Sequence, residues 1–295
     1  MRVAIKLGID FKTWDFSEEY GREVAQYMIQ AYKSGLTPNP DVMCNKEIKF
    51  GLFLKKALAE GADFIATGHY ARILKHKTGS LKLLKAKDTN KDQTYFLWTL
   101  TQNQLKHVLF PIGEYTKPQV RAMAKKFGLP TFDKKDSQGV CFIGQLDMKD
   151  FLEHYIQPQP GKVVLVDDVL HKKGTDVGTH DGVYYYTIGQ RHGFQANGGP
   201  YYVAGKSIKK NELHVVADES KIRTLISKMK DIHWINGRPN DSMEVSAKIR
   251  YRTAEIPAVV GKDSIRFQKS ALSVTPGQSI VFYKGQEVLG GGILA

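Results

Sequence analysis

The sequence predicts an α/β N-terminal domain with a parallel sheet, followed by two small, mainly β domains, of which the last is a β-barrel. Helical spacing of apolar residues and a short buried strand mark the first half of the chain. After Gly161 strands and turns alternate, and the last segment contains short strands only. A chain of 295 residues is also too long for one core of the usual size. We therefore predict domains at residues 1–157, 158–218 and 219–295.

The composition indicates a polyanionic partner and a reducing compartment. The 43 basic and 30 acidic residues leave a net charge of +13, which favours nucleic acid. No apolar run is long enough to span a bilayer, so a membrane partner is not expected. The two cysteines, Cys44 and Cys141, form neither a disulfide scaffold nor a four-ligand zinc site. The first residues lack the apolar core of a signal peptide, and we expect a cytoplasmic protein.

The first elements alternate between helix and strand. Residues 2–8 have the pattern of a final helical turn, and residues 11–16 read as a short strand. Apolar residues then recur at helical spacing up to Gly35. A second helix should end at Gly61, and residues 63–69 have the composition of a buried strand. A helix followed by a buried strand predicts a Rossmann-like parallel sheet.

Three polar or small residues follow that buried strand. Ligands of parallel sheets bind at the carboxyl ends of the strands, where Thr67, Gly68 and His69 would lie. A histidine at a strand end is equally common as a structural residue. Both roles are therefore open for His69.

A proline-rich loop precedes the second helix and contains the first cysteine. In residues 37–46, Thr-Pro-Asn-Pro-Asp-Val-Met-Cys-Asn-Lys, the two prolines fix their φ angles and predict a stiff, exposed loop. Asn45 is a candidate cap of the following helix.

The surroundings of Cys44 favour a reactive thiolate. Lys46, Lys49 and the start of a helix all place positive charge or a positive dipole near the thiol. A buried cysteine that acts as a small apolar residue is the alternative.

The second cysteine lies between two glycines. Cys141 follows Gly139 and precedes Gly144, downstream of two lysines. The glycines permit unusual backbone angles where a substrate approaches or the chain moves. A plain strand bounded by glycines is the alternative. Upstream of this segment we predict a solvated hairpin at residues 75–87 and a capped helix at residues 117–127.

The second half of the chain reads as strands and turns. A hairpin is predicted from residues 201–208 and 213–217, and a turn from residues 275–278. Residues 245–252 alternate strictly between apolar and polar side chains. The polar face forms a cationic row that suits phosphate contacts, although a solvated barrel exterior would have the same pattern. This row consists of Ser246, Lys248, Arg250 and Arg252.

Six ordered motifs make the whole chain resemble the tRNA-specific 2-thiouridylases, which replace oxygen by sulfur at C2 of the wobble uridine. The motifs are residues 37–46, Ala-Thr-Gly-His-Tyr-Ala (66–71), Lys-Asp-Gln (91–93), Asp-Ser-Gln-Gly-Val-Cys-Phe-Ile-Gly (136–144), Tyr-Thr-Ile-Gly-Gln-Arg (186–191) and Arg-Tyr-Arg (250–252). The resemblance implies a PP-loop ATP pyrophosphatase-like first domain with a helical insert. It also implies ATP and Mg²⁺ as cofactors, tRNA as substrate and a persulfide-donating sulfur carrier protein as partner.

The same resemblance implies roles for individual residues. Cys141 would carry a persulfide, and Cys44 would be the nucleophile that attacks it and leaves a Cys44–Cys141 disulfide. Asp41 could act as acid or base beside the target base, with Asn39 and Pro40 in contact with that base. Gly68 matches a nucleotide-contacting position. The positions that match tRNA contacts are His69, Lys91, Asp92, Gln93, Arg250, Tyr251 and Gln278.

One family feature does not occur in the sequence. The family's first domain starts with a strand and a Ser-Gly-Gly-x-Asp-Ser loop that binds the ATP pyrophosphate, and the 295 residues contain no such motif. We therefore expect a truncated PP-loop domain. Alternatives to an active enzyme are an inactive fragment and a non-catalytic tRNA-binding paralogue. A dithiol oxidoreductase ranks last because the cysteines form no Cys-x-x-Cys unit.

Overall fold

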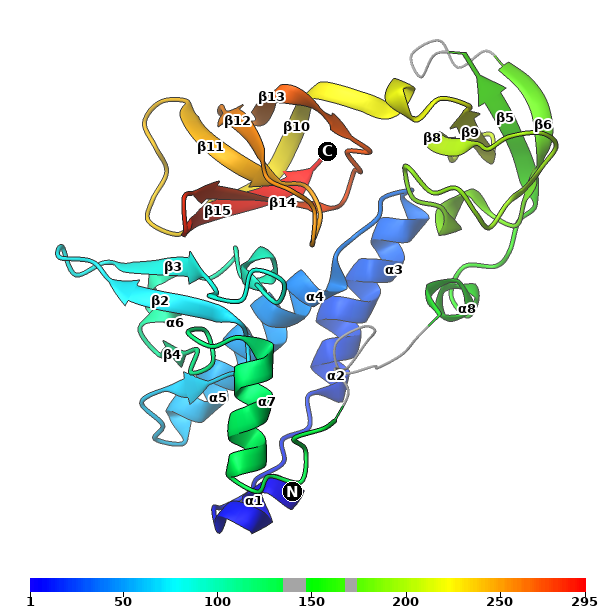
Figure 1. Ribbon diagram of the computed structural model, residues 1–295. Coiled ribbons are helices and arrows are strands. Elements are labelled where there is room, and N and C mark those ends of the chain that lie inside the picture. Colours follow the sequence, from blue (N-terminus) through cyan, green and yellow to red (C-terminus); the bar gives the residue numbers. More distant parts are fainter. Residues whose placement is uncertain (135–146, 168–173) are drawn as a thin grey trace.

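The computed structural model describes residues 1–134, 147–167 and 174–295 (Figure 1). The chain forms a helical N-terminal region, a central five-stranded sheet and a C-terminal barrel. The upper end of α3, in the N-terminal region, lies near the sheet and the barrel. Within the described residues, no helix is long and apolar enough to cross a membrane. The predicted domain boundaries at residues 157 and 218 stay predictions.

The first helical segments agree with the apolar spacing. A short helix α1 (Arg2–Leu7) ends at Gly8, whose φ of 64° is the left-handed conformation typical of a helix end. A continuous helical rod follows, formed by α2 (Ser17–Tyr20), a π-helical stretch η1 (Gly21–Ala25) and α3 (Gln26–Lys33). The strand predicted at residues 11–16 is wrong. Trp14 of this segment instead packs on Phe53, with 5.2 Å between the ring centres.

The second helical rod begins in the proline-rich loop. It consists of α4 (Pro40–Met43), the π-helical stretch η2 (Cys44–Phe53) and α5 (Leu54–Ala59). Asn39 is its cap, because the side-chain oxygen accepts the backbone N–H of Val42 at 3.2 Å. Pro40 occupies the first helical position, where its missing N–H costs nothing. The predicted cap at Asn45 is therefore wrong, since Asn45 lies inside the helix.

The predicted parallel sheet is present only as a short pair among the described residues. Strand β1 (Ile65–Ala66) pairs in parallel with β4 (Val108–Leu109). The segments around this pair are short helices. The predicted capped helix is α7, which follows Thr116, and the backbone N–H and hydroxyl of Thr116 donate to Gln119 Oε1. The short helices are η3 (Thr94–Phe96), α6 (Gln102–Leu105) and α7 (Lys117–Lys126).

A hairpin joins the N-terminal region to the barrel. Strands β2 (Ala71–Lys75) and β3 (Leu81–Lys85) pair antiparallel, and β3 also pairs with the last barrel strand. The hairpin predicted at residues 75–87 is therefore shifted, and its second strand is not solvated. Leu83 is fully buried, and Lys82 contacts Glu287 of the barrel at 2.7 Å. Strand β3 contains Lys82 and Lys85 itself, so its sequence resembles a solvated strand although Leu83 is buried.

The central sheet has the strand order β7-β6-β5-β9-β8. The predicted hairpin is confirmed as β8 and β9, and only β5 and β9 are parallel among its described neighbours. Buried Val163, Val203 and Leu213 form its core. The elements are α8 (Met148–Glu153), β5 (Gly161–Val166), β6 (Gly174–His180), η4 (Val183–Tyr185), β7 (Gln195–Ala196), β8 (Tyr202–Ser207) and β9 (Glu212–Val216).

The C-terminal strands form a closed six-stranded barrel. After the short helix η5 (Glu219–Ile222) the order is β10-β13-β12-β11-β14-β15, and pairing of β10 with β15 closes the barrel. Closure removes the exposed sheet edges. The strands are β10 (Arg223–Trp234), β11 (Met243–Lys248), β12 (Ile256–Val260), β13 (Ser264–Leu272), β14 (Ser279–Lys284) and β15 (Glu287–Leu294).

One barrel turn packs directly on the proline-rich loop. The backbone N–H of Thr37 donates to Pro276 O at 2.9 Å. Next to it, Gly277 has a φ of +93°, and a Cβ at this position would lie 2.8 Å from the nitrogen of Thr37. Only glycine combines this backbone angle with this close approach.

We predict that Gly277→Ala destabilises the protein by about 1–3 kcal/mol more than Gly285→Ala. Gly285 also has a positive φ, of +59°, but a Cβ there meets open space. The two variants therefore share the cost of the backbone angle and differ in the contact with Thr37. Chemical denaturation followed by fluorescence measures both. Equal losses of stability would show that the packing of the turn on the loop contributes nothing.

Candidate active site at the start of the second helix

The loop before the second helix is buried at the junction of three parts of the chain. Thr37 is 6% exposed, and its hydroxyl lies 3.2 Å from the Thr187 hydroxyl of the central domain. From the barrel, Gln278 donates through Nε2 to Thr37 O at 3.1 Å and to Pro38 O at 3.3 Å. The prediction of an exposed loop is therefore wrong, because two β domains pack on it.

Asn39, Pro40 and Asp41 form the first turn of the helix. Asn39 caps the helix and also hydrogen-bonds the buried Tyr95 hydroxyl. Burial raises the pKa of Tyr95 well above its usual value, against the opposing effects of Arg250 and Asn39. The Tyr95 hydroxyl therefore stays protonated and donates to Ser279 O at 2.7 Å. Asp41 lies half-buried in the first turn, where the helix dipole stabilises a carboxylate.

Cys44 lies one helical turn after Asp41 and is fully buried. The three-residue spacing places both side chains on the same helix face. Cys44 packs with Val24 and Ile48, so the thiol is shielded from solvent. Lys46 is exposed and pairs with Glu47 at 2.8 Å. The expectation of an open, reactive loop cysteine is therefore wrong in its exposure, and Cys44 resembles the buried alternative.

Cys141 lies outside the described residues. Its predicted role and the disulfide with Cys44 stay predictions. The described chain resumes at Asp147, whose carboxylate accepts the backbone N–H groups of Lys149 and Asp150 at the start of α8.

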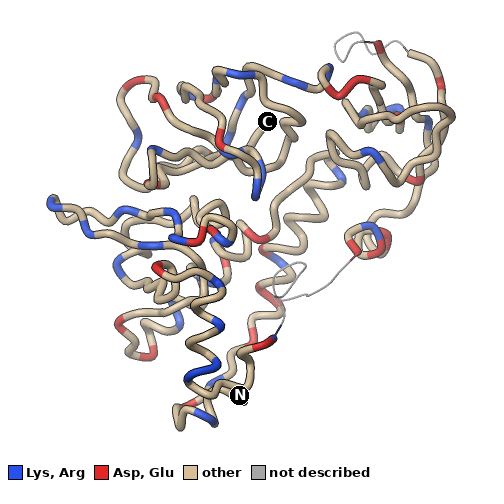
Figure 2. The backbone as a smooth tube through the Cα atoms, viewed as in Figure 1, with Lys and Arg blue, Asp and Glu red and all other residues tan. Residues whose placement is uncertain are grey.

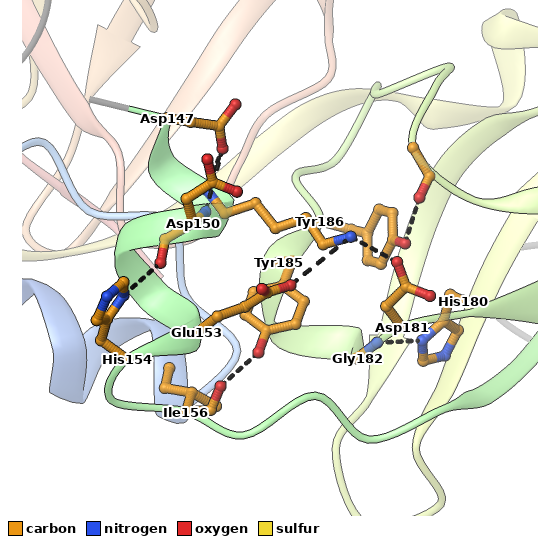
Figure 3. A network of polar contacts seen from close by, with 12 residues as sticks. Asp147, Asp150, Glu153, His154, Ile156, His180, Asp181, Gly182, Tyr185 and Tyr186 are labelled. Carbon is orange, nitrogen blue, oxygen red and sulfur yellow. Dashed lines mark hydrogen bonds and ion pairs between the residues drawn. The ribbon is translucent and has the colours of Figure 1, made fainter. Parts of the chain in front are cut away.

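A network of polar contacts fixes α8 to the central domain (Figure 3). Lys149 Nζ contacts Asp181 Oδ2 at 2.5 Å and Glu153 Oε1 at 3.8 Å. The Tyr185 hydroxyl donates to the carbonyl oxygen of Ile156 just after the helix. The chain that follows the Cys141 segment is therefore anchored on the central domain.

The end of β1 is the second predicted part of the site. The backbone N–H of Thr67 donates to Leu109 O at 3.1 Å, which continues the parallel pairing to this residue. A Cβ added to Gly68 meets no atom within 4 Å. The space beside Gly68 is therefore open at the carboxyl end of the strand, where parallel sheets bind ligands.

His69 is buried next to this open space. It is 8% exposed, packs against Phe50 and Phe110, and its Nδ1 lies 2.8 Å from the Thr67 hydroxyl. Burial, with a smaller effect of Lys49, lowers the pKa of His69 to about 3. The imidazole is therefore neutral at physiological pH. Its predicted contact with tRNA stays a prediction.

We predict that His69 makes the protein less stable in mild acid. The folded-state pKa lies below the unfolded value of about 6.5, so the unfolded state binds the proton first as the pH falls. Stability from this group is complete above about pH 6.5 and decreases toward pH 3, by about 2 kcal/mol between pH 6.5 and 5. Urea unfolding of wild type and His69→Gln over this range measures the difference. A parallel pH dependence in both proteins would contradict the neutral buried histidine.

The Lys-Asp-Gln motif supports the chain around His69. Asp92 is buried and accepts the Ala86 backbone N–H at 3.0 Å and the Thr94 hydroxyl at 2.8 Å. Gln93 exchanges two 2.9 Å hydrogen bonds with the backbone of Tyr70. These observed contacts are internal to the protein. The tRNA contacts predicted for Lys91, Asp92 and Gln93 stay predictions.

The predicted cationic row is interrupted. Strand β11 ends at Lys248, and Arg252 has a left-handed φ of 66°, so the strict alternation stops. Arg250 Nη2 donates to Ile188 O at 2.8 Å and to Ser273 O at 3.0 Å, which connects the central domain to the barrel. Tyr251 packs on Phe96, with 4.5 Å between the ring centres. The single flat row predicted from residues 245–252 is therefore wrong.

Positive charge is distributed over several parts of the molecule. Figure 2 shows Lys and Arg on the β2–β3 hairpin, along α7 and on the barrel. This spread agrees with the net charge of +13. Within residues 1–134, 147–167 and 174–295, no group of three or more His, Cys, Asp or Glu side chains could hold a metal ion.

Two residues of the site were missed in the sequence. Tyr95 and Thr187 both contact the loop, at Asn39 and Thr37 respectively. Each lies within or next to a family motif, Lys-Asp-Gln and Tyr-Thr-Ile-Gly-Gln-Arg. Their position in or beside a family motif could have predicted that Tyr95 and Thr187 lie at the site.

Three family models match consecutive parts of the chain. They are described as a tRNA methyl transferase HUP domain at residues 1–145, a tRNA methyl transferase PRC-barrel domain at residues 149–217, and an aminomethyltransferase beta-barrel domain at residues 225–294. The matches agree with a HUP-type first domain, a central β domain and a terminal barrel.

Several bacterial proteins are similar over the whole chain. The tRNA-specific 2-thiouridylase MnmA of Geobacillus thermodenitrificans is 46% identical over 304 residues, covering 100% of this chain and 80% of the relative. The proteins of the same name from Lysinibacillus sphaericus and Streptococcus sanguinis are each 42% identical, over 100% and 99% of this chain and 80% of each relative. The chain belongs to the family of the tRNA-specific 2-thiouridylases.

Proposed function

We propose that this chain is a tRNA-uridine 2-sulfurtransferase that replaces oxygen by sulfur at C2 of the wobble uridine. The observation that supports the proposal most strongly is the first turn of the second helix. It places Asp41 and Cys44 on one helix face and holds the preceding loop between the two β domains. The relatives named tRNA-specific 2-thiouridylase have 42–46% identity to the chain.

Sulfur transfer follows from the chemistry of two thiols. A persulfide on Cys141 supplies the sulfur. The Cys44 thiolate attacks the Cys141 sulfur that is bonded to the chain, which forms the Cys44–Cys141 disulfide and expels hydrosulfide. In this step the Cys44 thiolate is oxidised to the disulfide level, the outer sulfur is reduced to hydrosulfide, and the oxidation level of the Cys141 sulfur does not change. Hydrosulfide then adds to C2 of the adenylated uridine. The bond between C2 and its oxygen breaks, and AMP leaves with that oxygen.

Asp41, Asn39 and Pro40 are proposed to hold the target base. Asp41 lies in the first turn of the helix, where we propose that its carboxylate accepts or returns a proton beside the base. The burial of Cys44 excludes water from the sulfur, which would limit loss of hydrosulfide to solvent. These features fit a reaction that must keep a reactive sulfur species in place.

ATP is proposed to activate the uridine C2 oxygen by adenylation, with Mg²⁺ accompanying its phosphates. The open space beside Gly68, at the carboxyl end of a parallel strand, supports this proposal. The phosphates need the Ser-Gly-Gly-x-Asp-Ser loop, which the 295 residues do not contain. We propose that full activity requires this loop, together with a persulfide-donating carrier protein in the cytoplasm.

The test is to incubate the chain with unmodified tRNA, ATP, magnesium and sulfide, and to measure 2-thiouridine in digested RNA. A second reaction adds the N-terminal segment of a family member that contains the phosphate loop. The proposal expects ATP-dependent 2-thiouridine in the second reaction. Tight tRNA binding without product in either reaction would favour the non-catalytic paralogue instead.

In the reaction that contains the phosphate-loop segment, we predict that Cys141→Ser abolishes thiolation and leaves tRNA affinity within about twofold, because the persulfide sulfur is lost while the basic surface is unchanged. Filter binding and 2-thiouridine analysis measure the two effects. Loss of binding together with activity would assign Cys141 a structural role.

We predict that Arg250→Ala weakens tRNA binding and lowers the slope of log Kd against log salt by about one. Arg266→Ala is the matched control, since Arg266 is an exposed arginine on β13 that lies outside the predicted cationic row and the Arg-Tyr-Arg motif. An unchanged slope in Arg250→Ala, with loss of thermal stability, would limit Arg250 to the interdomain contacts with Ile188 and Ser273.

A further inference from the structure

We propose that a cavity between the two helical rods and the barrel binds a small organic ammonium ion, that is, a primary amine on a short apolar chain. The cavity has a volume of about 280 Å³, close to the lower end of the roughly 300–1,000 Å³ that ligand sites span. Its lining comes from α3, the second rod, residues 98–101 and strands β10, β14 and β15 (Figure 1). The proposal concerns a second site and does not depend on the thiolation reaction.

The cavity lies apart from the centre of the proposed reaction. Of the described residues in that centre, Asn39 lines the cavity, whereas Asp41 and Cys44 do not. Strand β14 pairs on one side with β11, which leads to Arg250 and Tyr251, and on the other side with β15, which is part of the cavity wall. A ligand in the cavity would therefore bind across β14 from these two residues with predicted tRNA contacts.

The inner wall of the cavity is apolar but contains two polar atoms without a partner. Val42 and Trp98 are 1% and 3% exposed, and they supply apolar surface together with Ile293. Trp98 Nε1 and Ser279 Oγ are buried, and neither has a hydrogen-bond partner among the described residues. Such atoms are costly and uncommon in a finished core. They indicate a place that a ligand or ordered water occupies.

One carboxylate at the rim has no counterion within the part of the chain that the structure describes. Asp231 is exposed, and its side chain takes part in no hydrogen bond or ion pair with the described residues. The two basic side chains of the lining do have partners. Lys46 Nζ pairs with Glu47 at 2.8 Å, and His233 Nε2 donates to Leu100 O at 3.0 Å. The uncompensated negative charge therefore favours a cation in the cavity.

Strand β10 is irregular at this carboxylate. Its pairing with β15 shifts between Lys230 and His233, and Asp231 has a left-handed φ of 52°. Such irregularities redirect side chains and are common beside functional sites, although they cost stability. Burial, and after it the negative charge of Asp231, raises the pKa of Tyr27, so the carboxylate lies near this ring. Aromatic rings such as those of Tyr27 and Trp98 attract cations.

These features together favour an amine with a single charge and an apolar chain. The ammonium group would lie at the rim beside Asp231, and the chain would pack on Val42 and Trp98. A carboxylate ligand would be repelled by Asp231, and a diamine would place its second charge against the apolar wall, where an unpaired charge is costly. An alcohol of the same length would keep the apolar contacts and lose the attraction to the carboxylate.

Calorimetric titration of the purified chain with n-hexylamine, and with 1-hexanol as its neutral counterpart, tests the role of the charge. We expect saturable binding of the amine in the millimolar range or tighter, and at least about tenfold weaker binding of the alcohol. Asp231→Asn should weaken amine binding by a similar factor, and asparagine tolerates the left-handed backbone angle. Asp241→Asn is the matched control, because Asp241 is exposed in the loop after β10 and lies outside the cavity.

A second variant tests the place of binding. Thr99 is half-buried and lines the cavity, so Thr99→Phe should fill part of it and weaken amine binding at least about tenfold. Thr78→Phe, at an exposed position between β2 and β3, is the control. Thermal unfolding first establishes that each variant is folded. Equal affinity for amine and alcohol, or unchanged amine affinity in Asp231→Asn or Thr99→Phe, would overturn the proposal. So would the absence of saturable binding to wild type at millimolar concentration, which would mean that the cavity holds water alone.

Discussion

The structure depends on the docking of a barrel turn onto a buried, proline-rich loop. Thr37 and Gln278 are 241 residues apart in the sequence, yet they share a hydrogen bond. The same loop contacts Thr187 of the central domain. Two prolines remove the donors with which the loop could organise itself, so the surrounding domains supply the donors. The position of the first turn of the second helix, and therefore of Asp41 and Cys44, is a property of the whole chain and not of the N-terminal region alone.

Three parts of the chain surround the first turn of the second helix, where the proposed chemistry would take place. The helix N-terminus supplies a favourable environment for a carboxylate, and the packing of Val24 and Ile48 removes Cys44 from solvent. On the other side, α8 is anchored to the central domain by Lys149 and Tyr185. The loop before Asp41 therefore contacts the central domain through Thr187. Helix α8, which follows the segment containing Cys141, is attached to the same domain. Under the proposed function, tRNA would bind to a site in which the loop and α8 are both held by the central domain before the tRNA arrives.

Much of the fold could be predicted from local patterns, and the failures have a common cause. The helices ending near Gly35 and Gly61, the cap at Thr116 and the hairpin β8–β9 follow from spacing and turn residues within short segments. The exposure of the loop and the continuity of the cationic row were predicted wrongly. In both cases a distant segment decides the outcome, the barrel turn at Gly277 or the central-domain carbonyl of Ile188. For the candidate site, the family resemblance implied Asn39, Asp41 and Cys44, and the structure places all three at the start of the second helix. The resemblance did not identify Tyr95, whose contact with Asn39 depends on tertiary packing.

The most direct test of the account is a single turnover with one equivalent of persulfide on the protein, with tRNA, ATP and the phosphate-loop segment present. Peptide mapping under non-reducing conditions would then measure the Cys44–Cys141 disulfide beside the yield of 2-thiouridine. The account predicts one disulfide for each 2-thiouridine, because attack by Cys44 releases the sulfur. Full product with Cys44 still reduced would contradict it, and would mean that the buried cysteine at the start of the second helix serves packing alone.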